Sequence, residues 1–236
     1  MTKQIEAKTK DAIKNLVSVH KKVVFPGFYG SYPDGAIHLL SRGGSDVTGS
    51  IIASSVSADI YENWTDVSGV LVADPRIIEN PKPIDVVTYK ELRELSYRGA
   101  SVLHEEAVFP VRRAGIPINI RNTNSPEDVG TWIVESTCHQ PDFTITGIAG
   151  KKGFSIINID KAMMNSELGF GRKVLQILEN FGISFEHLPS GIDTMSIVVD
   201  SKYVDGRKED IIEALSEEVF PDHISIEDGL ALIAVV

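Results

Sequence analysis

The sequence predicts an α/β protein built from two unlike parts, and three observations carry this prediction. Short apolar runs alternate with amphipathic stretches up to about residue 137, which is typical of a largely parallel sheet with helices on its faces. The polar segment 138–143 contains a proline and is the expected linker. Beyond it, strands and helices are expected in the order βαββαβ, which is the arrangement of ferredoxin-like domains.

In the first part, apolar residues at a spacing of three to four among Lys, Glu and Asp predict an amphipathic helix over residues 2–20. The short apolar run at 23–25, which ends at Pro26, predicts a buried strand, and Pro33-Asp34-Gly35 predicts a hairpin. The pattern then predicts helices at 47–60, 88–97 and 104–114 and strands at 62–64, 117–120 and 130–134.

In the second part, the same patterns predict helices at 168–181 and 206–219 and strands at 153–159, 183–188, 195–200 and 223–227. The last seven residues, 230–236, are all apolar and predict one more strand. This strand either pairs within the same sheet or begins a further unit.

Composition excludes several classes of protein. The formal net charge of −10 argues against a nucleic-acid-binding surface, which needs a basic face to displace counterions. Cys138 is the one cysteine, so no intramolecular disulfide forms, and six scattered histidines do not make a metal cluster. No apolar run approaches the roughly 20 residues that span a bilayer, and the charged first residues do not look like a signal peptide. We therefore expect a cytoplasmic protein with no membrane or nucleic-acid partner.

The loop 42–46 joins a predicted strand to a predicted helix and has the parts of an anion-binding site. Gly43 and Gly44 allow the backbone to approach a ligand, the helix N-terminus offers free amides, and Arg42 could grip a carboxylate or phosphate. Ser45 is the expected N-cap, and Asp46 falls in the first helical turn. The alternative is an ordinary glycine turn before a capped helix.

A second loop, residues 65–76, also follows a predicted strand. Asp66 could accept hydrogen bonds from a ribose or a base, and Arg76, after the fixed turn at Pro75, could reach a phosphate. Asp-Pro-Arg is also a common surface turn, so this reading has a purely structural alternative.

Together with segments 23–30, 99–104 and 115–120, these two loops resemble the aspartate kinases of the amino acid kinase family. The resemblance covers nearly the whole chain. It implies that residues 1–137 are the C-terminal, nucleotide-side part of an amino acid kinase domain, partial in extent. Residues 144–228 would then be an ACT regulatory domain, and residues 229–236 the first strand of a second, truncated ACT domain.

The resemblance implies phosphoryl transfer from Mg²⁺-ATP to the side-chain carboxylate of L-aspartate, the first step towards lysine and threonine. Catalysis of this kind depends mainly on positioning and on charge neutralisation around the phosphates. By position in the family motifs, Asp46 would organise groups around the transferred phosphoryl, and the substrate would meet Arg42, Gly43, Gly44 and Ser45. The nucleotide would meet Thr65, Asp66, Leu71, Arg76, Ser101 and Val102.

Three departures from the family pattern bear on these expectations. Leu71 stands where many members have a Tyr, and Ser101 stands where many have a Lys. The family's N-terminal Lys-Phe-Gly-Gly segment has no counterpart in these residues. We therefore expect that this polypeptide does not catalyse the reaction alone, and turnover in an ATP-dependent hydroxamate assay would contradict that expectation.

The resemblance also implies an amino-acid effector, lysine or threonine, and a homodimer formed through ACT domains. The expected effector contacts lie at a strand-to-helix turn and on the next strand and loop, at Met164, Asn165, Ser166, Gly169, Phe170, Phe185, Glu186 and Ser190. One alternative is a module that senses an amino acid and dimerises without chemistry. Another is a relative acting on glutamate, acetylglutamate or a nucleotide, which the ACT-like tail disfavours.

Overall fold

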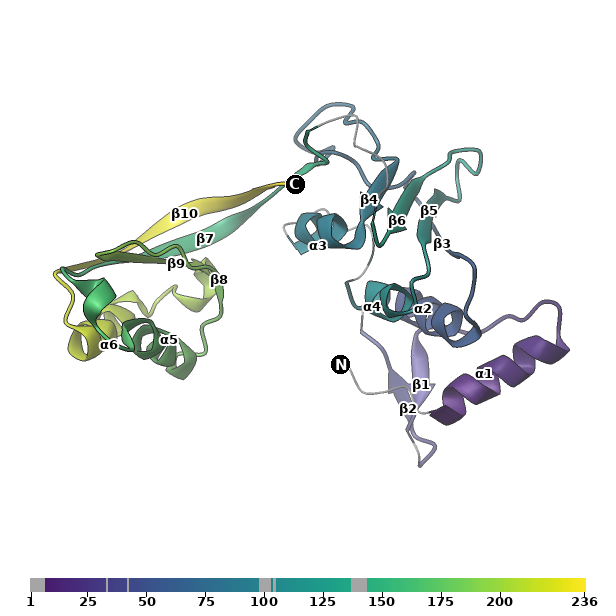
Figure 1. The fold of residues 1–236 in the computed structure, drawn as a ribbon, viewed down its shortest axis with the longest axis horizontal. Coiled ribbons are helices and arrows are strands. Elements are labelled where there is room, and N and C mark those ends of the chain that lie inside the picture. The colour runs from purple at the N-terminus through teal and green to yellow at the C-terminus, as the bar shows by residue number, and fades with distance from the viewer. Residues whose placement is uncertain (1–6, 33, 42, 98–102, 104, 137–143) are drawn as a thin grey trace. The chain divides into compact units, whose positions relative to one another are not determined.

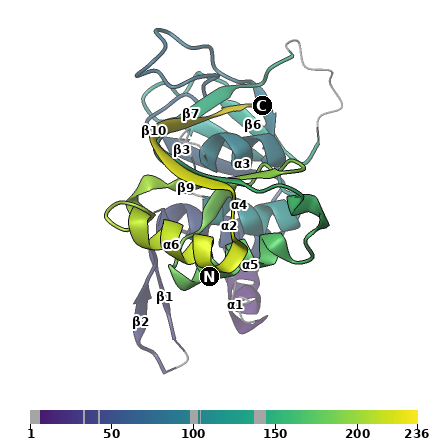
Figure 2. The same cartoon turned by 90° about the vertical axis from the view of Figure 1, so that its left-hand side faces the viewer.

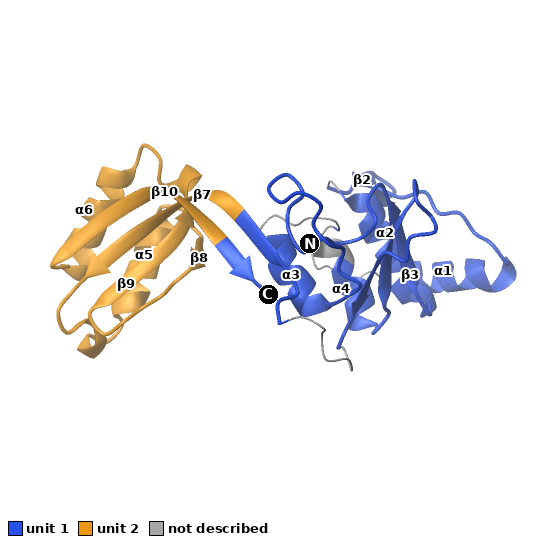
Figure 3. Ribbon diagram, turned by 90° about the horizontal axis from the view of Figure 1, so that it is seen from above, with its two compact units in different colours: residues 1–150, 233–236 blue, residues 151–232 orange. Residues whose placement is uncertain are grey.

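The computed structural model describes residues 7–32, 34–41, 43–97, 103, 105–136 and 144–236. The chain divides into two compact units, which Figure 3 colours separately. Unit 1 comprises residues 1–150 and 233–236, and unit 2 comprises residues 151–232. No described helix is long and apolar enough to cross a membrane.

Unit 1 is built on a four-stranded sheet in the order β3-β5-β6-β4. The strands are β3 (Tyr61–Thr65), β4 (Val86–Thr88), β5 (Ile118–Asn122) and β6 (Thr131–Val134). β3 pairs with β5 in parallel and β4 with β6 in parallel, whereas β5 and β6 are antiparallel. The prediction of a parallel-rich sheet is therefore confirmed. The sequence analysis missed β4, because three residues are too few to establish a period of two.

Helices α2 (Gly44–Val56), α3 (Tyr89–Tyr97) and α4 (Glu105–Arg113) accompany this sheet (Figure 1). All three were expected from the pattern, and Pro110 lies inside α4. The buried core of the unit draws on both the helices and the sheet, with Leu92 and Leu95 from α3 and Ile118, Ile120 and Ile133 from the strands. Burial of this apolar face is what fixes the helices to the sheet.

The N-terminal part of unit 1 differs from its prediction. Helix α1 (Ala7–Val19) forms as expected within the described residues, but residues 23–25 are not a strand, and Val24 is 95% exposed. An apolar run of three residues does not make a strand without a neighbouring strand to pair with. The predicted hairpin does form from β1 (Tyr29–Ser31) and β2 (Ile37–Leu39), and it projects from the rest of the unit (Figures 1 and 2).

Unit 2 contains β7 (Ile148–Asp160), α5 (Phe170–Asn180), β8 (Phe185–His187), β9 (Thr194–Asp200), α6 (Lys208–Val219) and β10 (His223–Val235), with β7 and β10 continuing into unit 1. Its sheet has the order β10-β7-β9-β8. The first and third strands of the motif are therefore central and antiparallel, as in a ferredoxin-like domain. The predicted βαββαβ fold is confirmed.

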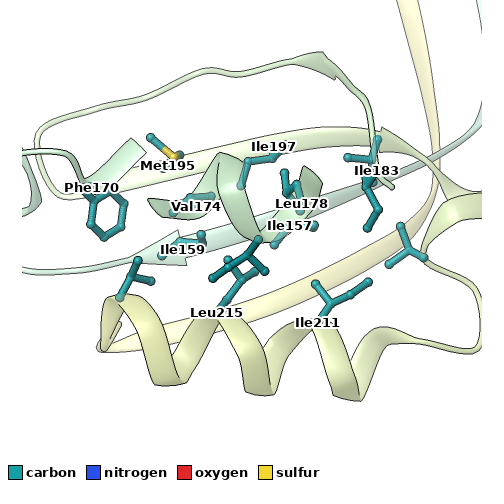
Figure 4. Packing of buried hydrophobic residues seen from close by; sticks show 14 of the residues in the cluster. Ile157, Ile159, Phe170, Val174, Leu178, Ile183, Met195, Ile197, Ile211 and Leu215 are labelled. Carbon is teal, nitrogen blue, oxygen red and sulfur yellow. The ribbon is translucent and has the colours of Figure 1, made fainter. Parts of the chain in front are cut away.

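The core of unit 2 lies between this sheet and the two helices (Figure 4). Ile157 and Ile197 from the sheet face Val174 and Leu178 of α5 and Leu215 of α6, and each is at most 1% exposed. The alternating burial along β7 and β9 explains why these strands were visible in the sequence. The helical stripe of α5 was visible for the same reason, at a period of 3.6.

The C-terminal strand corrects one expectation. Residues 223–227 and 230–236 were expected as separate strands, but β10 runs without a break from His223 to Val235. Gly229, with φ of 75°, is accommodated inside the strand, because glycine tolerates a positive φ without steric cost. Within unit 1, Val236 exchanges backbone hydrogen bonds with Gly147. The assignment of residues 229–236 to a second ACT domain stays a prediction.

Candidate functional site

The glycine loop before α2 is shaped by tight packing. Gly43 is the N-cap of α2 and has φ of 83°, a left-handed conformation that favours glycine. A Cβ on Gly44 would lie 2.5 Å from Leu40 Cβ and 3.2 Å from Phe28 Cδ2. Ser45 lies inside the first turn, and the prediction that it is the N-cap is wrong, because the N-cap is Gly43, two residues earlier. Arg42 lies outside the described residues.

Asp46 is held in the first turn of α2 by strand β3. Its Oδ1 accepts a hydrogen bond of 3.0 Å from Nδ2 of Asn63, which is 8% exposed. The Tyr61 hydroxyl donates to the backbone carbonyl of Asp46 at 3.2 Å. Burial raises the pKa of Tyr61, the hydrogen bond from Asn63 lowers it, and the negative charge of Asp46 raises it, with a net upward shift. The network links the glycine loop to the strand that ends at Thr65.

Sequence reasoning missed Asn63 as a functional candidate. An amide in a strand that packs under a helix is costly to bury unless it is hydrogen-bonded. Its position two residues before Thr65 could have been noticed, but only the fold places Asp46 opposite it.

The nucleotide candidates Thr65 and Asp66 lie where β3 ends. The carbonyl of Thr65 accepts hydrogen bonds from the backbone N–H of Thr123 at 2.8 Å and from its hydroxyl at 2.9 Å. The Thr65 hydroxyl donates to Asp66 Oδ1 at 3.2 Å, and the Asp66 side chain is otherwise exposed to solvent. The backbone is therefore fixed, while the carboxylate of Asp66 faces outward.

The next residues pass close to β6. Gly69 has φ of 112°, and a Cβ there would lie 2.3 Å from Oγ1 of Thr131. That hydroxyl accepts from the backbone N–H of Val70 at 2.8 Å and donates to the carbonyl of Ile84 at 2.6 Å. Leu71 is half-buried and pairs with Pro83 in an isolated bridge, so its backbone is part of an extended return segment. Ser101 and Val102 lie outside the described residues.

Arg76 is exposed but already paired. Its Nε and Nη2 donate to the carboxylate of Asp74, with Nη2 2.6 Å from Oδ2. The hydrogen bond from Arg76 lowers the pKa of Asp74 and raises the pKa of Arg76 itself. The pair orients the guanidinium, so a phosphate would be met chiefly by Nη1.

In unit 2, the candidate effector turn lies between β7 and α5. Met164 and Phe170 are 5% and 4% exposed and belong to the hydrophobic core, whereas Asn165 and Ser166 are exposed. Gly169 is the N-cap of α5 and has φ of 79°. The side chains of Met164 and Phe170 therefore point into the core. The part of all five residues in binding an effector stays a prediction.

A charged cluster that sequence reasoning did not single out stands beside this turn. Glu167 accepts from Nζ of Lys161 at 2.5 Å and from Nζ of Lys173 at 2.8 Å. Hydrogen bonds from these two lysines lower the pKa of Glu167. Lys161 also donates to the carbonyl of Val219 and lies 5.5 Å from the ring of Phe170. Spacing along the sequence gives no signal for this cluster, because Lys161 meets Val219 only through the fold.

The remaining effector candidates lie along the far edge of the unit 2 sheet. Phe185, 44% exposed, and the half-buried Glu186 are on β8, which is the edge strand paired with β9. Ser190 pairs with Met195 in an isolated bridge, in the loop where the carbonyl of Ile192 accepts from the backbone N–H of Asn165 at 3.1 Å. The structure therefore connects this loop to the turn between β7 and α5 within one unit.

Comparison with known proteins identifies relatives of the whole chain. The family model described as "Amino acid kinase family" matches residues 1–122. Aspartokinase 3 of Bacillus subtilis is 46% identical over 230 residues, which is 96% of this chain and 50% of that protein. The chain thus spans about half the length of this curated relative.

Solved structures show the same similarity. The aspartate kinase of Clostridium acetobutylicum is 57% identical with a TM-score of 0.90, covering 97% of this chain and 53% of that one. Escherichia coli aspartokinase III, solved in complex with lysine and aspartate in the T-state, is 28% identical with a TM-score of 0.71, covering 95% of this chain and 50% of that one. Its R-state structure, with aspartate and ADP, has a TM-score of 0.70 at 27% identity and covers 95% of this chain and 51% of that one. The resemblance to aspartokinases that the motifs indicated is confirmed.

Proposed function

Because the chain belongs to the amino acid kinase family, we propose that its function is that of an aspartate kinase, transferring the γ-phosphoryl group of ATP to the side-chain carboxylate of L-aspartate. One observation supports this most directly. The hydrogen bond from Asn63 to Asp46 sets the glycine loop of α2 against strand β3, which ends at Thr65, next to Asp66. A substrate loop and a nucleotide loop on adjoining elements are what in-line phosphoryl transfer requires.

The described residues fit a nucleotide. Asp66 is exposed just after β3, and Arg76 presents a charged edge beside an exposed turn. Asp46 uses Oδ1 to accept from Asn63, which leaves its second oxygen for cationic groups around the phosphoryl. No group of three or more His, Cys, Asp or Glu among the described residues could hold a metal by itself, so Mg²⁺ would arrive on the phosphates.

We assign a regulatory role to unit 2, with lysine or threonine as the effector and a homodimer as the assembly. Support comes from its ferredoxin-like fold and from the E. coli relative solved with lysine. Because Met164 and Phe170 lie in the core, an effector at this turn would meet backbone groups, Asn165 and Ser166. The domain assignment, 144–228 for the ACT domain, is part of the same proposal.

Calorimetry on the chain tests the function. We expect binding of Mg²⁺-ADP and of L-aspartate, and binding of lysine or threonine at a separate site. Arg76→Met should weaken ADP binding several-fold by removing a phosphate contact, while Arg172→Met, the same change on α5, should leave it unaltered. Effector binding without any nucleotide or aspartate binding would favour a non-catalytic sensor instead.

A further inference from the structure

The loop that carries Thr65 and Asp66 is hydrogen-bonded to the start of β6 and to the connection between β5 and β6, which comprises residues 123–130. At one end, Thr123 donates two hydrogen bonds to the carbonyl of Thr65. At the other end, Thr131 accepts from the backbone N–H of Val70. Between these points, Asp66 and Val67 are exposed. The loop is therefore anchored at both ends, with its outward side open.

In the middle of this loop, Ser68 makes two side-chain hydrogen bonds. Its hydroxyl oxygen accepts a hydrogen bond of 2.8 Å from Nδ2 of Asn122, which is 8% exposed on β5. The same hydroxyl donates to Oδ2 of Asp128 at 2.5 Å. An amide N–H only donates and a carboxylate only accepts, so the chain Asn122 to Ser68 to Asp128 has one possible direction. A hydrogen bond to a charged acceptor is stronger than a neutral one.

The β5–β6 connection is itself held without help from Ser68. Arg121 donates from Nη2 to the carbonyl of Pro126 at 2.6 Å. Its guanidinium lies 4.9 Å from the ring centroid of Trp64, the residue just before Thr65. Asn119 on β5 donates to the carbonyl of Val129 at 3.1 Å. The position of Asp128 is therefore set by the connection, and its carboxylate is a fixed acceptor for the Ser68 hydroxyl.

We propose that Asp128 is a positioning residue for the nucleotide. It touches no reacting atom. Through Ser68 it holds the loop from Thr65 to Gly69 in the conformation that presents Asp66, so that binding does not have to order the loop. This inference rests on the proposed function, because the ligand it concerns is the nucleotide of that reaction.

Three variants test the proposal, with the Kd for Mg²⁺-ADP and for L-aspartate measured by calorimetry. Asp128→Ala should raise the Kd for ADP about tenfold and leave the Kd for aspartate unchanged, because one charge-assisted hydrogen bond is lost at the nucleotide loop alone. Asp128→Asn keeps an acceptor oxygen and should restore most of the affinity. Glu127→Ala removes the same charge from the neighbouring position and should have no effect.

Hydrogen exchange provides a second readout that does not need a ligand. Amides of residues 65–70 should exchange faster in Asp128→Ala than in the unaltered chain and in Glu127→Ala, while amides of α5 should not change. Equal ADP affinity and equal exchange in Asp128→Ala would overturn the inference while leaving the proposed function intact. Equal loss of ADP and aspartate binding would show a general structural defect and would also overturn it. Failure of the unaltered chain to bind ADP would overturn the proposed function, and the nucleotide role of Asp128 with it.

Discussion

The candidate sites of the two units are constructed in opposite ways. In unit 1, the loops before α2 and after β3 are set by glycines whose neighbours leave no room for a Cβ, and the polar side chain of Asp66 faces outward. In unit 2, the turn before α5 is anchored by Met164 and Phe170 in the core, and its charged residues pair with one another. The first candidate site leaves the side chain of Asp66 exposed to solvent, whereas the second buries its largest side chains, Met164 and Phe170, in the core.

This difference shows that a glycine with a positive φ before a helix does not by itself identify a binding site. Gly43 and Gly169 are both helix N-caps with a positive φ. Gly43 is followed in the first helical turn by Asp46, whose carboxylate accepts a hydrogen bond from Asn63. Gly169 is followed directly by Phe170, an aromatic residue of the core. Substitutions at core residues, at glycines and at charged residues therefore test whether the two candidate sites are built in these different ways.

The largest effect is expected in the core of unit 2, under helix α5. Leu178→Ala should reduce the free energy of unfolding of unit 2 by about 3 kcal/mol, because Leu178 is 1% exposed and its removal leaves a cavity. Leu168→Ala is the matched control, since Leu168 lies in the turn before α5, outside the core, and is 96% exposed. Urea unfolding followed by far-UV circular dichroism measures both. A cost for Leu168→Ala similar to that of Leu178→Ala would contradict this description of the turn.

A smaller effect is expected from a glycine in the unit 1 loop. Gly69→Ala should cost about 2 kcal/mol, because the new Cβ would collide with Thr131 and φ of 112° is strained for alanine. The two tryptophans, Trp64 and Trp132, both lie in unit 1, so intrinsic fluorescence during urea unfolding reports this unit.

The matched control is Gly171→Ala in α5, where the added Cβ would lie at an ordinary 3.5 Å from Met195 Cε. Alanine favours the helix, so no loss of stability is expected there. If the two alanine substitutions proved equally tolerated, the contrast between the glycine-shaped loop and the core-anchored turn would fail.

The smallest expected effect is on the loss of stability at acid pH. Hydrogen bonds from Lys161 and Lys173 lower the pKa of Glu167 in the folded state. The stability that these contacts confer is therefore present above the ordinary Glu pKa of about 4.3 and is lost as the pH falls through the lowered value. The urea midpoint should drop more between pH 5 and pH 3 in the unaltered chain than in Glu167→Gln. Glu217→Gln, an exposed site on α6, should keep the full acid dependence.

Much of the fold was predictable because its longer elements bury one face. The stripe of α5 and the alternation in β7 and β9 follow directly from this burial, and so does the ferredoxin-like order. Two short apolar runs of unit 1 behaved differently. β4 was missed and the strand expected at 23–25 is absent, because so short a run is stabilised only by a partner distant in the sequence.

The same division holds for the candidate sites. The sequence by itself determined the family, the glycine positions and the order of the loops, because these depend on backbone conformation and on residue types that are neighbours along the chain. Only the tertiary structure decided that Asn63 holds Asp46, that Asp128 reaches Ser68 and that Met164 and Phe170 belong to a core. Each of these contacts joins residues that are distant along the chain, and each depends on how the sheet brings its strands and helices together.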